Sequence, residues 1–330
     1  EQFWYVQRVI VQNFSSIILN LNCKMICPHC GQEHPDNYSF CPVTGQKIAP
    51  QFKACSNEQC SDYGKYILPL DSSFCPSCGH PVDGSSESAS MDSDILEFEI
   101  EDVSFKMILV EHGHFMMGAT SEQEDPYNGE KPAHKVTLTK DYYMGETQVN
   151  QVLWETVMGN NPSCFEGEER PVESVSWNEC QEFIRELNRK LRSQLHGKSF
   201  RLPTEAEWEF AARGGNNRCG YQYSGSDDLD EVACYSDNSD SETCDVASFE
   251  PNELGIYDMS GNVCEWCHDW YGSYNRSAQT DPKGPSSGSG RVIRGGSWRG
   301  VVRVCRLSFS YYRSPDDSDF NLGLRLALSE

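Results

Sequence analysis

Residues 201–213 read RLPTEAEWEFAAR and are the most informative stretch of the chain. Thr204 followed three residues later by Glu207 is the pattern of a capping box, in which each side chain bonds the other residue's backbone amide. We therefore predict a helix that opens at this box and runs through Arg213. Gly214 and Gly215 follow directly, and from there the character of the sequence changes.

Upstream of this stretch the pattern is more regular. Apolar residues at 105–110 and 136–138 predict two strands. Residues 147–158 predict a short helix. A second, amphipathic helix is predicted where apolar residues recur at steps of three and four, at Trp177, Cys180, Ile184, Leu187 and Leu191.

After Gly215 the chain is rich in Gly, Ser, Asn, Asp and aromatic residues and has little periodicity. About 110 residues of this kind predict an irregular fold dominated by loops. Such loops need internal support, which buried Trp side chains, backbone hydrogen bonds or metal ions can supply.

Length, net charge and hydropathy exclude several classes of protein. The chain has 330 residues, and a domain takes roughly 150, so we expect about two domains. A net charge of -23 argues against a general binder of nucleic acid, which needs clustered Lys and Arg. The sequence lacks an apolar stretch of about 18 residues, so we predict no membrane span.

The first 24 residues are left as an unassigned leader. The apolar run at 17–19 is too short for a secretory signal, and Met25 is an alternative start. We therefore expect a cytoplasmic protein with reduced thiols, in which paired cysteines favour zinc over disulfides.

Residues 25–48 and 52–82 are loose repeats of one cysteine pattern, and the Ser- and Asp-rich residues 83–96 form a predicted flexible linker. The second repeat predicts a zinc ribbon, because two pairs of thiolates suit tetrahedral zinc. Its expected ligands are Cys55, Cys60, Cys75 and Cys78.

The first repeat is degenerate. It keeps Cys27, Cys30 and Cys41 but has Thr44 at the fourth position, where His29 or His34 could substitute. The region resembles the double zinc ribbons of many bacterial proteins, which implies an interaction module for a protein partner.

Residues 97–330 form the predicted large domain. Several strings occur in it in a fixed order, including Arg201–Arg213, Gly261-Asn262-Val263 before Glu265-Trp266, and Arg291–Trp298. Together they resemble the formylglycine-generating enzyme (sulfatase-modifying factor) family over about 97–328. The resemblance implies an α+β, loop-rich, C-type-lectin-like fold.

In the enzymes of that family two cysteines bind copper(I) and activate oxygen, because soft thiolates suit this ion. Here Cys305 matches the second cysteine, whereas the first position is Gly300. We therefore expect no oxidase and read Cys305 as a small buried apolar residue, with catalysis there as a weaker possibility. The iron-binding His-x-x-x-His-x-Glu run of related oxygenases is absent from the sequence.

The resemblance also implies a calcium ion. The positions that match its ligands are Asp258, Glu265 and the carbonyls of Gly261 and Val263. Hard oxygen ligands on an irregular loop suit Ca²⁺. The alternative is that these acids bond loop amides without a metal.

Residues 299–325 read RGVVRVCRLSFSYYRSPDDSDFNLGLR and lack Lys, Glu, Gln, Met and Trp. These five amino acids are the ones that codons of the form NNC cannot encode. The pattern resembles the variable region of proteins diversified by retroelements. The candidate variable, ligand-binding positions are Arg299, Gly300, Val301, Val302, Val304, Ser308, Ser310, Tyr311, Tyr312, Ser314, Asp317, Asp319 and Phe320.

Three hypotheses follow. The favoured one is a non-catalytic binder that displays this segment to an unknown protein or carbohydrate, because Tyr, Ser and Asp suit adaptable contact surfaces. The second is a copper or related metal-dependent oxidase acting on protein or thiol substrates. The third is a structural paralogue inside a larger complex, which predicts neither variation nor chemistry.

Within the segment 299–325 we expect Phe309 to pack in the core, whereas Tyr311 and Tyr312 cannot both face inward on one strand.

Overall fold

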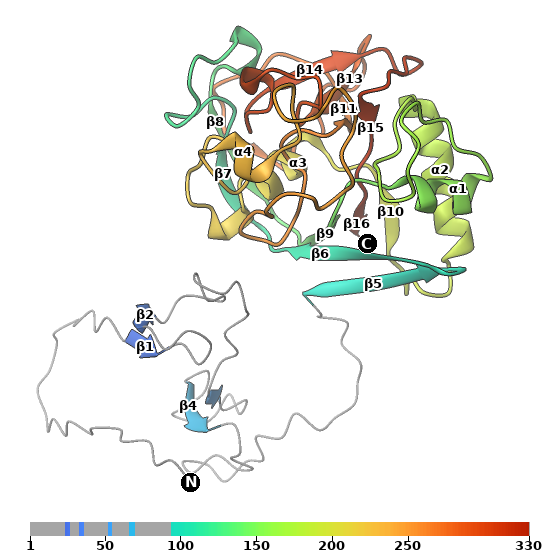
Figure 1. Ribbon diagram of the computed structural model, residues 1–330. Coiled ribbons are helices and arrows are strands. Elements are labelled where there is room, and N and C mark those ends of the chain that lie inside the picture. The colour runs from blue at the N-terminus through green and yellow to red at the C-terminus, as the bar shows by residue number, and fades with distance from the viewer. Residues whose placement is uncertain (1–23, 27–32, 36–51, 55–65, 70–93, 330) are drawn as a thin grey trace, which may run out of the picture. The chain divides into compact units, whose positions relative to one another are not determined.

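The computed structural model describes residues 24–26, 33–35, 52–54, 66–69 and 94–329, in two units that divide at Ser90 and Met91 (Figure 1). The first unit contains two antiparallel hairpins. Strand β1 (Lys24–Ile26) pairs with β2 (Glu33–Pro35), and β3 (Phe52–Ala54) pairs with β4 (Tyr66–Pro69). The seven predicted zinc ligands lie outside the described residues, so the zinc sites stay predictions.

A five-stranded antiparallel sheet, in the order β10-β16-β9-β6-β5, runs through the second unit. The strands are β5 (Ile95–Ile100), β6 (Val103–Val110), β9 (Tyr142–Gly145), β10 (Ser199–Arg201) and β16 (Ala327–Ser329). Strand β5 begins at Ile95, within the residues 83–96 that are predicted as a linker.

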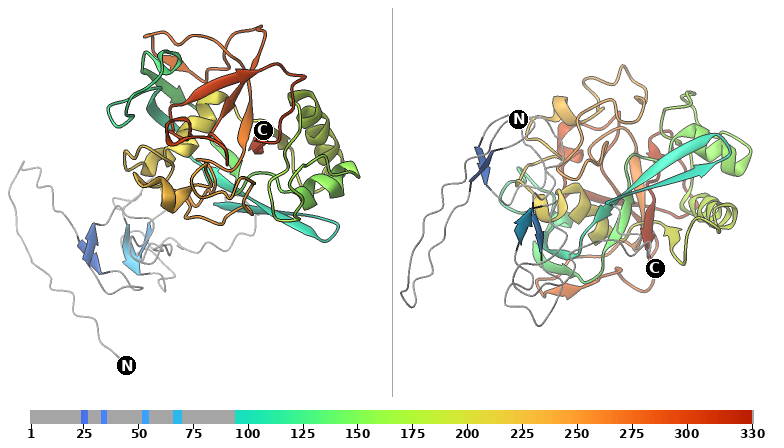
Figure 2. Two further views of the ribbon diagram at one scale, coloured as in Figure 1. Left: turned by 45° about the horizontal axis from the view of Figure 1, so that its top comes forward. Right: turned by 90° about the horizontal axis from the view of Figure 1, so that it is seen from below.

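Side chains of this sheet alternate between two cores. In β9, Tyr143 packs with the core that includes α1 (Gln151–Met158) and α2 (Trp177–Lys190), while Tyr142 and Met144 pack with the core that includes α3 (Glu205–Ala212). Figures 1 and 2 show α1 and α2 on one side of β16 and α3 on the other. Each core is therefore built from one face of the same strands.

The predicted helices are present, and their caps explain their limits. The Thr204–Glu207 capping box opens α3 as expected, and Arg213 is its C-cap residue. A second box, Ser176–Glu179, opens α2. Helix α1 begins four residues later than predicted, because Asn150 is its N-cap.

The remaining chain is irregular, as its composition predicts. Two small sheets stand among its loops. One has the order β12-β8-β7, with β7 (Gly113–Met117), β8 (His134–Leu138) and β12 (Gln279–Thr280). The other has the order β14-β13-β11-β15, with β11 (Cys264–Trp270), β13 (Arg291–Arg294), β14 (Ser310–Arg313) and β15 (Leu322–Gly323).

Four short helical turns complete the second unit. They are η1 (Asn128–Glu130), η2 (Gly215–Asn217), α4 (Leu229–Val232) and η3 (Val302–Val304). Among the described residues, no helix has the length and apolar character that crossing a bilayer requires.

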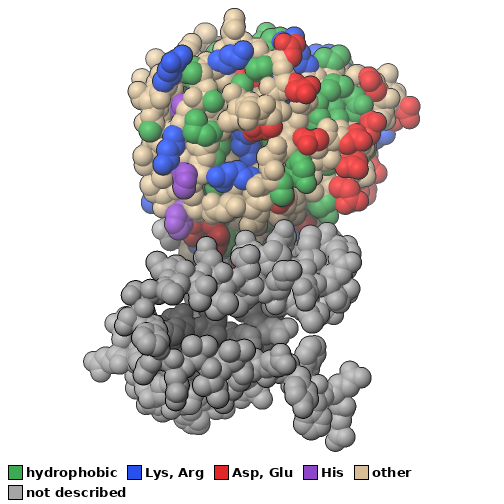
Figure 3. Space-filling view, turned by 90° about the vertical axis from the view of Figure 1, so that its left-hand side faces the viewer, with side chains coloured by type: hydrophobic (Ala, Val, Ile, Leu, Met, Phe, Trp, Pro, Cys, Tyr) green, Lys and Arg blue, Asp and Glu red, His purple; other side chains and the backbone are tan. Residues whose placement is uncertain are grey.

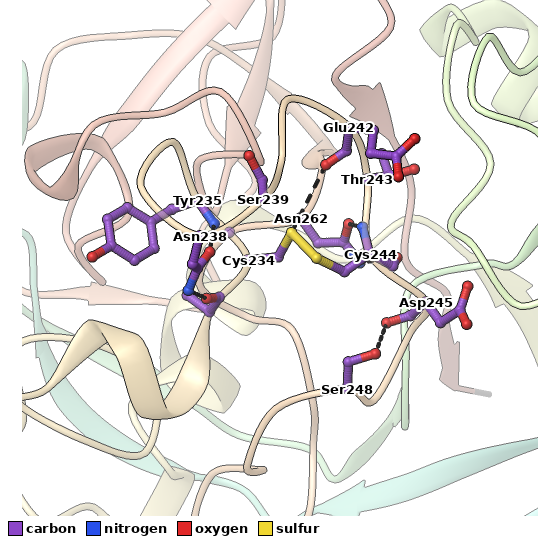
Figure 4. The surroundings of a disulfide bond; sticks show 12 residues. Cys234, Tyr235, Asn238, Ser239, Glu242, Thr243, Cys244, Asp245, Ser248 and Asn262 are labelled. Atoms are coloured by element: carbon purple, nitrogen blue, oxygen red, sulfur yellow. Dashed lines mark hydrogen bonds between the residues drawn. A yellow bond between two sulfur atoms is a disulfide. The ribbon is translucent and has the colours of Figure 1, made fainter.

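A disulfide closes the loop between Cys234 and Cys244, whose Cα atoms lie 6.3 Å apart (Figure 4). The expectation of uniformly reduced thiols is wrong for this pair. Asn262 joins both ends of the loop to the start of β11: its amide bonds the backbone of Cys244 in both directions at 3.1 Å, and its own backbone N–H donates to Cys234 at 2.8 Å. The fold brings the two cysteines together, and their spacing in the sequence does not predict the bond.

Candidate ligand-binding surface

The segment 299–325 is held to the body of the second unit by buried ion pairs. Arg306 forms a two-pronged pair with Glu130, with both N–O distances at 2.7 Å, and both side chains are 1% exposed. Arg325 pairs with Glu265 at 2.8 Å, and Arg294 just before the segment pairs with Glu209. Two-pronged Arg–carboxylate pairs fix geometry as well as adding energy.

The Glu130 carboxylate is the acceptor in one of these ion pairs and also bonds Ser308. Burial alone would raise its pKa, but hydrogen bonds from Arg306, Ser308 and the Tyr127 backbone amide outweigh burial and hold the pKa below its ordinary value. Glu130 is therefore charged in the folded protein at neutral pH, and it needs Arg306 to be so.

Two predicted contact residues belong to this support and not to the surface. Ser308 is fully buried and donates its hydroxyl to Glu130. Ser310 is 6% exposed and donates to Glu205 at 2.6 Å. Their contact with a ligand stays a prediction, and in this structure both hydroxyls bond buried carboxylates, which a small hydroxyl side chain suits as well as a wet surface.

Gly300 is a third predicted contact residue that lies buried in the structure. Its backbone N–H donates to the carbonyl of Ser297 at 2.7 Å. A Cβ atom at this position would lie 2.7 Å from Cγ2 of Val304. Gly300 therefore forms a tight turn, and a side chain there would need Val304 to move.

We call the following set the anchor residues, because each is buried and bonds a carboxylate: Arg294, Arg306, Ser308, Ser310 and Arg325.

Other residues of the same segment point to solvent. Eight large hydrophobic side chains are exposed among the described residues, and five of them lie in this segment, which marks it as a candidate contact surface. They are Val301, Val302, Tyr311, Tyr312 and Phe320, with exposed fractions from 37% to 58%. We call these five the display surface.

The two tyrosines lie on β14, the edge strand of its sheet, and both are exposed. Their rings stack with centroids 5.3 Å apart, and Tyr312 also stacks on Tyr271 at 4.6 Å. Phe309, expected in the core, is only half-buried and lies against Tyr127 at 5.8 Å. Two residues from outside the segment thus extend an aromatic surface that sequence alone does not assemble.

A cavity of about 310 Å³ opens between the two parts of this surface. Its walls include Val301, Val304 and Tyr311, with Arg299 and Arg313 beside them. Asp319 lies between these two arginines, at 3.1 Å from Arg299 and 3.4 Å from Arg313. The arginines are therefore positioned by a carboxylate while their side chains stay partly accessible.

The two remaining candidates, Ser314 and Asp317, close the turn after β14. The Asp317 carboxylate accepts from the Ser314 backbone N–H at 3.1 Å, and Asp317 is exposed. They flank the surface without lining the cavity.

The residues do not fit the copper site of the related enzymes. Cys305 is fully buried, and burial raises the pKa of its thiol to about 12. Gly300 supplies no ligand atom at the first cysteine position. A single protonated thiol does not make a two-thiolate copper(I) site, so we derive no oxidation step through it.

The predicted calcium ligands do converge. Oxygens of Asp258, Gly261, Val263 and Glu265 lie 2.9 to 3.5 Å from one atom, the Nε2 nitrogen of Gln148, while its buried Oε1 has no hydrogen-bond partner. The contributing oxygen of Asp258 is its backbone carbonyl, because its carboxylate accepts from the Ala247 N–H. Four oxygens near one point and an unpartnered amide oxygen suit a cation, whereas the Glu265 carboxylate is already paired with Arg325, so calcium stays a prediction.

Taken together, the fold and surface define a lectin-like, loop-rich scaffold that presents an exposed segment near its C-terminal end. Residues 98–330 match the model of the sulfatase-modifying factor enzyme 1-like domain. The chain belongs to this family.

Three similar proteins illustrate the range of the family. "Chaperone protein LppX" of Paenibacillus barcinonensis is 32% identical over 273 residues, which cover 69% of this chain and 91% of that protein. The solved structure of Treponema denticola variable protein 1 has 34% identity and a TM-score of 0.65, and covers 71% of this chain and 99% of its own.

The formylglycine-generating enzyme of Streptomyces coelicolor is 36% identical over 176 residues, or 48% of this chain. The match spans about half of that enzyme, 52% of its length.

Proposed function

We propose that this chain is a non-catalytic ligand-binding protein whose C-terminal segment is diversified by a retroelement and displayed on a scaffold of the formylglycine-generating-enzyme type. The observation that carries the proposal is the division within residues 299–325. Within this stretch the buried anchor residues Arg306, Ser308, Ser310 and Arg325 and the five exposed display residues lie interspersed, and Ser310 is the direct neighbour of Tyr311.

This division is what a diversified surface requires. Residues that bond buried carboxylates cannot vary without loss of the fold, whereas exposed side chains can change at little cost in stability. Aromatic side chains on a fixed backbone give large contact area at low entropic cost. The similarity to Treponema denticola variable protein 1 supports this proposal.

The ligand is expected to be a protein or a carbohydrate. Stacked tyrosines favour both, because their faces pack on apolar groups and their hydroxyls form hydrogen bonds. We also propose zinc at Cys55, Cys60, Cys75 and Cys78, a less complete site at Cys27, Cys30 and Cys41, and a protein partner for this N-terminal region. Measuring the zinc content of the purified chain and of its C75S/C78S variant tests the site at Cys55, Cys60, Cys75 and Cys78, and the variant should contain less zinc.

The experiment that tests diversification is to read the DNA beside the gene. The proposal predicts a near-copy of codons 299–325 next to a reverse transcriptase gene, with differences confined to template adenines. The structure sharpens the expectation: differences fall on the codons of the display surface, whereas those of Arg306 and Arg325 agree between the copies. The absence of a near-copy, or differences spread equally over both sets of codons, would contradict diversification.

Calcium is proposed at the oxygens around Gln148. Titration of Ca²⁺ into chelator-treated protein is expected to raise the unfolding temperature. The Gln148→Leu variant removes the unpartnered amide oxygen and keeps both members of the Glu265–Arg325 pair, and it should lose the response. Mg²⁺ is the matched control ion, because it is smaller and demands stricter octahedral geometry. An equal response to both ions would contradict a specific calcium site.

A further inference from the structure

A second cavity, of about 570 Å³, lies away from the display surface. It is formed by the outer face of the β7–β8 pair and by the loop that follows α3. Met116 in β7 is paired with Lys135 in β8, and His114 lies two residues before Met116. Because side chains alternate along a strand, these three project from the same face of the sheet.

Two cations line this cavity without an acidic partner. Among the described residues, neither Lys135 nor Arg218 forms an ion pair, and both are exposed. The one hydrogen bond of the Arg218 guanidinium goes to the backbone carbonyl of Gly215 at 3.1 Å. In a chain with 27 basic and 50 acidic residues, two cations that line one cavity and form no ion pair are unexpected.

The single acid in the wall does not neutralise them. The Glu122 carboxylate is 2.7 Å from Arg213 and also accepts from Thr120. Burial would raise its pKa, but these bonds outweigh burial and lower it. Arg213 in turn bonds Glu209 and the carbonyl of Gly118, so Glu122 and Arg213 form a closed network, and the open charges are those of Lys135 and Arg218.

Charge is also separated on a larger scale over this side of the unit. Figure 3 shows the face on which β7 and β8 lie in Figure 1, with Lys, Arg and His side chains over one half and Asp and Glu side chains over the other. This face therefore carries a positive half despite the negative charge of the whole chain.

Part of the wall is apolar. Met116 is 46% exposed, and Tyr221 and Leu307 line the same space. This combination suits a ligand with an anionic group at one end and an apolar body at the other, because small-molecule sites pair apolar walls with a few placed polar groups.

We propose that this cavity binds a small organic phosphate, with the phosphate between Lys135, Arg218 and His114 and the apolar body against Met116 and Tyr221. Arg presents a planar fork and Lys a point charge to phosphate oxygens. The proposal stands apart from diversification of the tail, since none of its key residues belongs to the candidate variable positions.

The test is calorimetric titration of the full chain with phenyl phosphate, with inorganic phosphate and benzyl alcohol as single-feature probes. The K135Q/R218Q variant is expected to bind phenyl phosphate about tenfold more weakly or worse, which corresponds to about 1.4 kcal/mol. The matched control is K283Q/R276Q, which removes two exposed cations outside the cavity and should bind like the parent.

The apolar wall has its own variant. M116S should lower the affinity for phenyl phosphate toward that for inorganic phosphate and leave the affinity for inorganic phosphate unchanged. Saturable binding that K135Q/R218Q weakens and the control does not would support the site. Absence of saturable binding, or equal weakening in both double variants, would overturn it. A Y311A/Y312A variant should bind phenyl phosphate normally, which separates this result from any failure of the display surface.

Discussion

The anchor residues and the display surface differ in burial although all of them except Arg294 lie in one short segment, 299–325. Ser310 and Tyr311 are neighbours, yet one bonds a buried carboxylate and the other is half exposed. Arg306 is buried in an ion pair, whereas Val302 four residues earlier faces solvent. The difference shows how a segment can be fixed in position and still offer side chains that contribute little to the fold.

The largest expected effect comes from breaking an anchor. Arg306→Ala leaves the Glu130 carboxylate buried and unpaired, and we expect a loss of about 3–5 kcal/mol in the free energy of unfolding. Urea unfolding followed by tryptophan fluorescence measures it. The R306M/E130M double variant is the control, since replacing both charges should cost much less. A loss below about 1 kcal/mol for Arg306→Ala would show that the pair does not hold the segment.

A smaller effect is expected from the disulfide loop, which forms a hydrogen bond to the start of the segment. The Ser236 backbone N–H donates to the carbonyl of Gly300 at 3.1 Å, so the loop reaches the first turn of the segment. Removing the crosslink with C234S/C244S should cost about 2–3 kcal/mol, as expected for a short closed loop. As a control, reducing the disulfide of the parent protein should lower the free energy of unfolding by the same amount. An unchanged free energy of unfolding would mean that the loop holds its shape without the bond.

The next prediction concerns acid. The pKa of Glu130 is lower in the folded protein than its ordinary value of 4.5, so the Glu130–Arg306 pair stabilises the fold above that value. This contribution is lost as the pH falls through the lowered pKa. Glu130→Gln should therefore flatten the acid limb of the stability profile. A parallel profile, merely shifted downward, would contradict the assignment.

The smallest effects separate the two sets of residues directly. Ser310→Ala leaves a buried carboxylate oxygen with one bond fewer, and we expect a loss of about 1–2 kcal/mol. Val301→Ser, at a side chain 58% exposed, should change stability by less than about 0.5 kcal/mol. Thermal unfolding of the two variants side by side measures the contrast. Equal losses would remove the distinction between anchor and display positions.

The local elements could be predicted because their signals are local. The Thr204–Glu207 box and the spacing from Trp177 to Leu191 each specify a helix within a few residues. The aromatic surface could not be assembled in this way. Tyr127 meets Arg303 with the guanidinium carbon 3.7 Å from its ring centroid, although 176 positions separate them, and this contact depends on the whole fold.

The burial of Ser308 and Ser310 also depends on the whole fold. A sequence shows that a serine is polar, but it does not show that a buried carboxylate lies beside it. Gln148, at the centre of the calcium oxygens, carries no signal of that place in its own neighbourhood. Composition identified the segment, but only the fold divides it into supporting and exposed positions.

The most direct test of this division is to randomise the five anchor residues in one displayed library and the five display residues in another, and to measure the fraction of members that resist protease. The account predicts that most members of the display library remain folded and that few members of the anchor library do. Equal fractions in the two libraries would contradict the claim that this segment is a variable surface on a fixed support.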